Sequence, residues 1–167
     1  MDFPQYPTTP WPRPSVFPIV LNAGGELLEL HQPQIVGILN LTPDSFSDGG
    51  RYNTPQAAVE QAGHLLEQGA DWLDLGAQST RPGAENITVQ EEQDRLLPAL
   101  EAVRAAFPSA RISLDTERAE VARAALLFRP QLLNDVSGLA TDPALAQVAA
   151  ENQLPLVLMH RQGTPQT

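Results

Sequence analysis

The feature that most constrains the fold of this chain is a regular alternation of short apolar segments with segments of helical periodicity, beginning at residue 34. Short apolar runs bounded by glycine, proline and polar residues are typical of buried strands. Five segments are expected to be strands: residues 34–39, 71–77, 111–116, 131–136 and 154–160. Four segments between them are expected to be helices: residues 54–69, 88–107, 117–128 and 142–152. Strands joined by crossover helices are parallel, with right-handed connections.

Capping residues support the first two of these helices. Thr54 is a suitable N-cap, Pro55 suits the first turn, and Gly69 suits the residue after the last turn. Thr88 and Glu91 form the capping-box pattern, in which each side chain binds a backbone N–H of the other residue. These signals predict where both helices begin.

The N-terminal segment, residues 1–18, is rich in proline and lacks the basic stretch and apolar core of a secretory signal. We interpret it as an extended tail. Residues 19–30 contain two short apolar runs on either side of Gly24-Gly25, which predicts a small hairpin. The folded domain is therefore expected to span residues 19–167.

The order of elements predicts an α/β fold with two possible architectures. One is an open, doubly wound sheet, and the other is part of a TIM-type (β/α)8 barrel. A complete barrel has eight repeats and about 250 residues. This sequence of 167 residues provides five strands and four helices, so the second architecture would be a partial barrel.

Composition excludes several classes of function. A formal net charge of −10 argues against a nucleic-acid surface, which needs clustered cations. All ten basic residues are arginines, which excludes Schiff-base and P-loop lysine chemistry. The absence of cysteine removes thiolate chemistry and fits a cytoplasmic protein. Since no apolar stretch approaches the about 20 residues that span a bilayer, we expect no membrane partner.

Polar side chains gather where the predicted strands end. They are Asn40, Asp74, Asp115, the Asn134-Asp135 pair and His160. Any one of them could be a helix cap or a structural group, and a lone histidine near a chain end is more often structural. However, the carboxyl ends of parallel strands form one edge, where helix N-termini also favour an anion. Together these residues therefore predict a shared ligand site.

Two segments that follow strands are unusually rich in functional groups. Residues 40–50 combine acids, hydroxyls and a glycine pair with Phe46. Residues 76–84 place hydroxyls beside Arg81, whose planar guanidinium suits phosphate or carboxylate. The glycines match neither a dinucleotide nor a P-loop fingerprint.

These segments resemble the dihydropteroate synthase family. The resemblance rests on "GILNLTPDSFSDGG", "STRPG", "SLDT", "LNDVSG" and "LVLMHRQGTPQT", in that order, and the first motif is highly specific. Family members are (β/α)8 barrels of the cytoplasm. They join a dihydropterin methyl diphosphate to 4-aminobenzoate and release pyrophosphate. The resemblance therefore implies a transferase of folate biosynthesis that takes these small molecules and Mg²⁺.

The resemblance also implies roles for residues at three strand ends. Asn40 would ligate the Mg²⁺ that holds pyrophosphate, and Asp115 and Asn134 would bind the pterin ring. Gln78 stands where the family commonly has an acid, so neither it nor His160 is given a role.

Further roles are implied for the two segments after the strands. Thr80 would contact the pterin diphosphate, and Arg81 would bind its anionic oxygens. Phe46, Thr80 and Pro82 would shape the aminobenzoate pocket. Asp44 would face the positive charge that develops when pyrophosphate leaves.

The resemblance covers only the first part of the family's chain. A further pterin-binding Asp, a Lys, and an Arg-His pair that the family carries on later strands have no counterpart here. The sequence therefore predicts a shortened form without synthase activity of its own, and dimerisation, which the family achieves near its C-terminus, is not expected. A non-catalytic pterin-binding remnant and a pterin-dependent methyltransferase are the alternatives.

Overall fold

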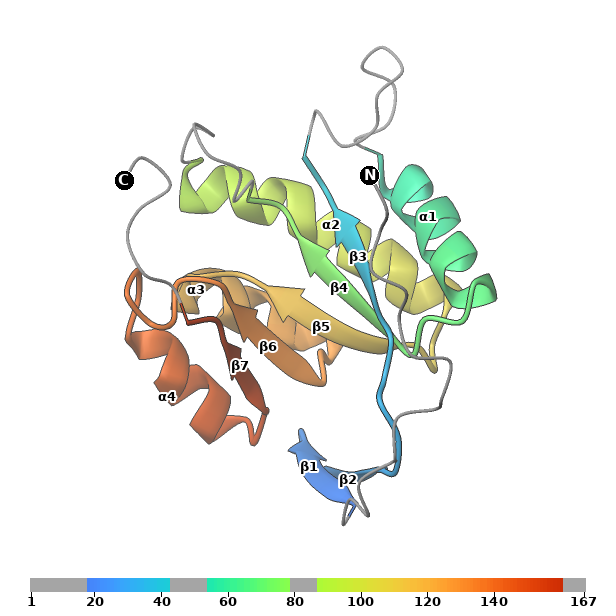
Figure 1. Cartoon of the computed structure of the whole chain (residues 1–167). Helices are drawn as coiled ribbons and strands as arrows, with labels where there is room; N and C mark the ends of the chain where they lie inside the picture. The colour runs from blue at the N-terminus through green and yellow to red at the C-terminus, as the bar shows by residue number, and fades with distance from the viewer. Residues whose placement is uncertain (1–17, 43–53, 79–86, 161–167) are drawn as a thin grey trace, which may run out of the picture.

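The computed structural model describes residues 18–42, 54–78 and 87–160 (Figure 1). In chain order its elements are β1 (Ile19–Ala23), β2 (Glu26–Leu30), β3 (Val36–Asn40), α1 (Pro55–Glu67), β4 (Trp72–Gly76), α2 (Val89–Ala106), β5 (Arg111–Asp115), α3 (Ala119–Ala125), the 3-10 turn η1 (Leu126–Phe128), β6 (Leu132–Asp135), α4 (Ala144–Glu151) and β7 (Leu156–Leu158). The predicted tail lies outside the described residues, apart from its last position.

Strands β3 to β7 form one parallel sheet in which the spatial order follows the chain order. Helices α1 to α4 lie along one face of this sheet (Figure 1). A doubly wound sheet would reverse its strand order and carry helices on both faces. That alternative is therefore wrong. The prediction of a partial barrel with five parallel strands, four helices and a preceding hairpin is confirmed.

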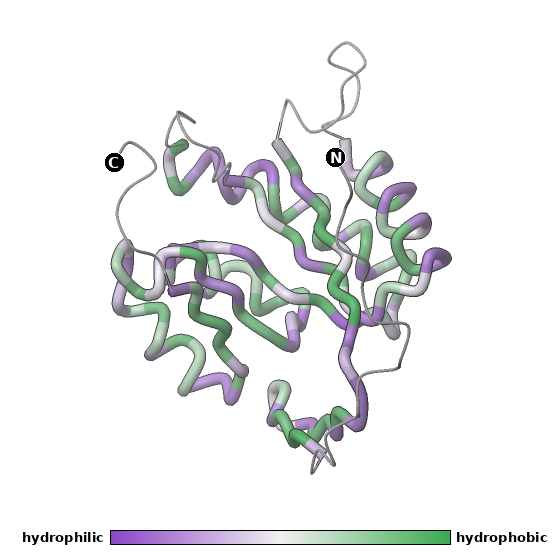
Figure 2. The backbone as a smooth tube through the Cα atoms, in the orientation of Figure 1, coloured by the Kyte–Doolittle hydropathy of each residue, from purple (hydrophilic) through white to green (hydrophobic). Residues whose placement is uncertain are grey.

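Alternate residues of each strand face the helices and form the main core. The strand side chains in this core are almost completely buried: Leu39, Leu73, Leu75, Ile112, Leu114 and Leu133. They pack against apolar side chains of the helices, among them Ala62, Leu96, Leu100, Val103, Val121, Leu145 and Val148. Figure 2 shows the helices alternating between hydrophobic and hydrophilic residues, as expected for helices that cover a sheet on one side.

The predicted caps of the first two helices are confirmed. Thr54 Oγ1 accepts a hydrogen bond from the N–H of Ala57 at 3.3 Å. Both bonds of the capping box between Thr88 and Glu91 are formed. Gly69, with φ of 95°, ends the turn after α1 in a conformation that other residues rarely adopt.

Helix α3 differs from its predicted range of 117–128. It begins at Ala119, whose N–H donates to Asp142 Oδ2 at 2.8 Å, so a side chain from the next repeat satisfies the helix start. It ends at Ala125, and Arg129 then takes a left-handed conformation with φ of 52°. The apolar residues of the last predicted turn therefore belong to η1. Sequence periodicity does not distinguish α-helix from a terminal 3-10 turn.

The hairpin β1–β2 lies beside the amino ends of the strands (Figure 1). Ala23 and Leu28 pack on Trp72, with Leu21 and Leu132 against them. The N–H of Gly24 donates to the carbonyl of Gln153 at 3.0 Å. The hairpin thus covers the start of the sheet's inner face, on the side opposite the helices. Within the described ranges, no helix is long and apolar enough to cross a membrane.

Candidate functional site

The carboxyl ends of the strands bring three predicted site residues into one row. Pairing across the sheet aligns Asn40 with Gly76, Gly76 with Asp115, and Asp115 with Asn134. The two residues between Asn40 and Asn134 in this row lie on neighbouring strands, so all four backbone positions stand side by side. The alternation of the strands points the row to the inner face, away from the helices.

Gly76 leaves room for the Asp115 side chain. A Cβ at position 76 would lie 2.8 Å from Asp115 Oδ2 and 3.0 Å from Asp115 Cβ. The carboxyl group of β5 therefore rests over the backbone of β4. Any side chain at this position would displace it.

The electrostatic setting of Asp115 is unusual. Burial raises the pKa of its carboxyl from an ordinary value of 3.8 to about 7. Nearby carboxylates act in the same direction, and they belong to Asp74, Glu117, Glu92 and Asp135. Near neutral pH this carboxyl is therefore divided between its protonated and ionised forms. It can both donate and accept a hydrogen bond in a ligand site.

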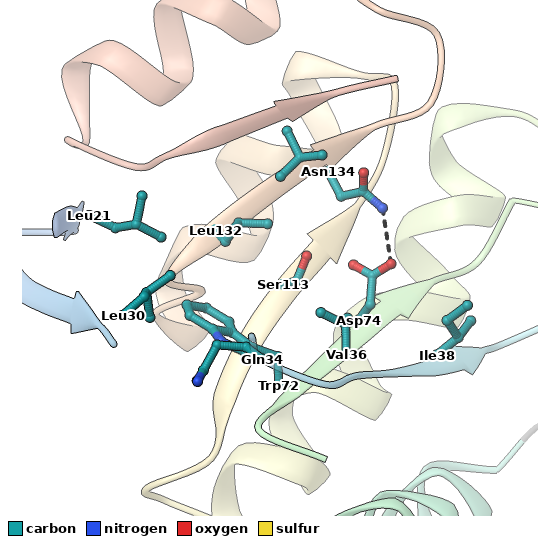
Figure 3. Close-up of a pocket in the computed structure, with 11 residues that line it drawn as sticks. Leu21, Leu30, Gln34, Val36, Ile38, Trp72, Asp74, Ser113, Leu132 and Asn134 are labelled. Atoms are coloured by element: carbon teal, nitrogen blue, oxygen red, sulfur yellow. Dashed lines mark hydrogen bonds between the residues drawn. The ribbon is translucent and has the colours of Figure 1, made fainter. Parts of the chain in front are cut away.

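A second row lies one step closer to the hairpin. Asp74 pairs with Ile38 and with Ser113, and its Oδ2 accepts a hydrogen bond from Asn134 Nδ2 at 3.0 Å (Figure 3). Asp74 is 7% exposed. Its other oxygen, Oδ1, is buried and has no hydrogen-bond partner among the described residues.

A cavity of about 390 Å³ opens along this inner face. Figure 3 shows its lining, which is Leu21, Leu30, Gln34, Val36, Ile38, Trp72, Asp74, Ser113, Leu132, Asn134 and Val157. Most of this lining is apolar. Asp74, Ser113 and Asn134 contribute polar groups on the side of the cavity nearer the carboxyl ends of the strands. Its size lies within the range of small-molecule sites. Asp115 is not part of the lining; it pairs with Asn134 in the first row, at the carboxyl ends of the strands.

Behind Asp115, a buried ion pair joins α2 to the end of β5. Thr116 Oγ1 donates to Glu92 Oε1 at 2.7 Å, and Arg118 Nη1 donates to Glu92 Oε2 at 2.9 Å. Arg118 Nη2 also donates to the carbonyl of Ile87 at 2.6 Å. Burial raises the pKa of Glu92, and the bonds from Thr116 and Arg118 oppose this. Sequence reasoning missed this pair, although Glu92 stands four residues before Leu96 on the apolar face of α2.

The other predicted strand-end residues have different surroundings. Asp135 is completely buried and faces the helix side, where it accepts bonds from the N–H groups of Ser137 and Leu139. It therefore shapes the turn after β6 and does not enter the site. His160 is exposed, and Gln78 is half-buried. The remaining predicted site residues lie outside the described residues: Asp44, Phe46, Thr80, Arg81 and Pro82.

The predicted metal ligand, Asn40, is exposed at the end of β3. Among the described residues there is no group of three or more His, Asp or Glu side chains that could hold a metal ion. One neutral amide oxygen fits only a cation that takes most of its ligands from water and substrate, as Mg²⁺ does with phosphates. The magnesium role of Asn40 stays a prediction.

The sequence was compared with families of known proteins. A family model described as pterin binding enzyme matches residues 36–167. The match covers most of the sequence, and the chain belongs to the pterin binding enzyme family. Within that family it is similar to dihydropteroate synthases, as the motifs indicated.

A dihydropteroate synthase of Synechocystis sp. is 45% identical over 152 residues, which are 90% of this chain and 52% of that relative. The structure of Xanthomonas albilineans dihydropteroate synthase with 4-aminobenzoic acid has a TM-score of 0.79 and 42% identity, covering 88% of this chain and 53% of that one. The same enzyme in complex with indole-2-carboxylic acid and 6-chloroguanine has a TM-score of 0.76 and 41% identity. The chain spans about half the length of the curated relatives it matches. Both of these relatives are named as dihydropteroate synthases.

Proposed function

We propose that the inner face of the sheet binds the pterin ring of 6-hydroxymethyl-7,8-dihydropterin diphosphate in the dihydropteroate synthase reaction. The observation that carries this proposal is the pairing of Asp115 with Asn134 in one row beside a mostly apolar cavity. The pterin ring is flat and apolar on its faces, and it carries nitrogen donors and acceptors on its edges. An apolar slot with a carboxyl and an amide at one end has matching chemistry.

The two polar residues serve different parts of that recognition. Asn134 offers an amide oxygen as an acceptor, because its nitrogen already donates to Asp74. Asp115 can donate or accept, because its pKa is raised to about 7. A ring nitrogen without hydrogen would bind the protonated form, and an N–H would bind the ionised form. The protonation state of Asp115 is thereby linked to which ligand nitrogen it binds.

The chemistry of the proposed reaction needs charge neutralisation at the diphosphate. Asn40, at the end of the same row, would supply one oxygen to Mg²⁺, which would neutralise charge on the diphosphate, and Arg81 would bind anionic oxygens of the leaving pyrophosphate. Asp44 stabilises the positive charge that develops on the methylene carbon. Thr80 contacts the diphosphate, and Phe46, Thr80 and Pro82 shape the site for 4-aminobenzoate. These roles rest on the resemblance of the motifs.

The proposed partners are small molecules, namely the dihydropterin diphosphate and 4-aminobenzoate. The proposed location is the cytoplasm, in agreement with the absence of cysteine. Neither a nucleic acid nor a membrane is proposed as a partner. A homodimer is not proposed for this chain.

Calorimetry with 6-chloroguanine tests the pterin subsite. We expect saturable binding to the wild-type chain, and a loss of about tenfold or more in affinity for Asn134→Ala, which removes the acceptor. Glu60→Gln, on the exposed face of α1, is the matched control and should bind as the wild type does. Absence of saturable binding to the wild type, or equal affinity of the wild type and Asn134→Ala, would contradict the proposal.

A further inference from the structure

Asp74 is a buried acidic residue of the sheet that is given no ligand contact in the proposed function. It is 7% exposed on β4 and stands between Ile38 and Ser113 in its row. A carboxylate in such surroundings is costly unless its oxygens are satisfied. One oxygen binds Asn134, and the other has no partner among the described residues. A group retained in this state requires a reason other than stability.

The bond to Asn134 restricts the orientation of an amide that could otherwise turn either way. The two ends of an Asn side chain have almost the same shape, but one donates and the other accepts. A carboxylate oxygen offers an acceptor, and here it is the Asn134 nitrogen that faces it at 3.0 Å. Asn134 must therefore present Nδ2 to Asp74, and its Oδ1 points away from that bond (Figure 3).

This orientation decides what the site can recognise. With Oδ1 turned away from Asp74, Asn134 offers an acceptor beside Asp115, and it selects ligands that present an N–H at that point. With the amide reversed, it would offer a donor and select a ring nitrogen without hydrogen. The hydrogen bond links residues that are 60 positions apart in the chain, so it forms only when β4 and β6 are correctly placed on either side of β5.

We propose that Asp74 is a positioning residue: it fixes the Asn134 amide with its oxygen toward the ligand and so makes the site selective for a nitrogen heterocycle with an N–H donor at that position. The kind of ligand in this inference rests on the proposed function. The orientation of the Asn134 side chain does not, because it is a property of the chain without ligand.

Three variants separate positioning from a structural role. Asp74→Asn keeps an oxygen that can accept from Asn134 but adds an N–H that can donate to it, so it no longer fixes which end of the amide faces the ligand, whereas Asp74→Leu keeps the branched shape and removes every acceptor. Asp71→Leu is the matched control. Asp71 also holds one hydrogen bond, from the N–H of Ile35 at 2.7 Å, but it lies outside the cavity lining.

The first readout is the Asn134 side-chain amide in ¹⁵N–¹H spectra of the full chain, which requires no ligand. In the wild type we expect two well-separated amide proton signals, one of them protected from exchange, and in Asp74→Asn, which can hold the amide either way round, we expect weaker protection. In Asp74→Leu that protection should be lost. Unchanged Asn134 signals in Asp74→Leu would overturn the inference, even if 6-chloroguanine binds as proposed.

The second readout pairs 6-chloroguanine affinity with stability in urea. We expect Asp74→Leu to bind about tenfold more weakly while remaining at least as stable as the wild type, and the affinity of Asp74→Asn to lie between those of the wild type and Asp74→Leu. Asp71→Leu should lose stability and keep affinity. If Asp74→Leu instead loses stability as Asp71→Leu does and keeps its affinity, Asp74 is structural and the inference fails. If the wild type does not bind at all, the proposed function fails, and the amide signals still decide the positioning role.

Discussion

Replacing Asp115 with asparagine should make the protein more stable at alkaline pH and leave its stability nearly unchanged at acidic pH. Burial raises the pKa of Asp115 to about 7 from an ordinary value of 3.8. Below about pH 3 the carboxyl is largely protonated in both the folded and the unfolded chain, so it causes little difference between them. As the pH rises from about 3 to 7, the unfolded chain ionises while the folded chain stays largely protonated. The free energy of unfolding therefore falls over that range and has lost its full amount above pH 7.

The size of this effect follows from the shift itself. One pH unit corresponds to about 1.4 kcal/mol, so the shift from 3.8 to about 7 gives at most about 4 kcal/mol. Because the Asp115 carboxyl is only half-buried, solvent screening reduces the expected loss to about 2 kcal/mol or somewhat more. Asp115→Asn removes the ionisation and keeps the shape. At pH 8 it should exceed the wild type by roughly this amount.

Urea unfolding at pH 4.5 and pH 8 measures the effect. The quantity of interest is how much the stability difference between Asp115→Asn and the wild type changes between the two pH values. Other carboxylates titrate in both proteins, and their contributions cancel to first order. Glu60→Gln, which changes an exposed carboxylate of α1, is the control and should differ from the wild type by less than about 0.5 kcal/mol at both pH values. Equal stability of Asp115→Asn and wild type at pH 8, or a greater advantage at pH 4.5, would refute the reasoning.

Three further predictions follow from individual contacts. Gly76→Ala should weaken 6-chloroguanine binding about tenfold, since the new Cβ would lie 2.8 Å from Asp115 Oδ2, and calorimetry with wild-type affinity would count against it. Arg118→Met should destabilise the fold by about 3 kcal/mol, because Glu92 stays buried without its charged partner, whereas the double variant with Glu92→Leu should lose less. Urea unfolding of the wild type, both single variants and the double variant checks this, and additive losses would contradict it. The chain should bind Mg²⁺ negligibly unless pyrophosphate is present, since Asn40 offers one neutral oxygen, and tight binding of Mg²⁺ alone in calorimetry would contradict this.

Much of the fold could be predicted because its determinants are local. The alternation of apolar runs and helices predicts parallel strands, and the capping residues Thr54, Thr88 and Glu91 place two helix starts correctly. The choice between two architectures could not be made from the repeats, because it depends on which strands pair. Only the observed order, with neighbours in the chain also neighbours in the sheet, decides it.

From the sequence, the residues of the candidate site could be placed at the strand ends, but the face of the sheet on which each side chain lies could not be predicted. Asn40, Asp115 and Asn134 share a row because parallel strands in register bring their carboxyl ends together. The sequence does not distinguish Asn134, which faces inward, from Asp135, which faces the helices and shapes a turn. A shift of one residue exchanges the two faces of a strand. The bond between Asp74 and Asn134, and the ion pair between Glu92 and Arg118, depend on distant segments meeting, which no local pattern encodes.

The central claim is that a pterin ring binds on the inner face of the sheet at the row of Asp115 and Asn134. Titrating 7,8-dihydropteroate into the ¹⁵N-labelled chain and mapping the shifted signals tests it most directly. We predict saturable shifts of the Asn134 side-chain amide and of backbone N–H groups at the carboxyl ends of β4, β5 and β6, with the exposed face of α1 unaffected. Shifts confined to other surfaces, or no saturable shifts at all, would contradict the claim.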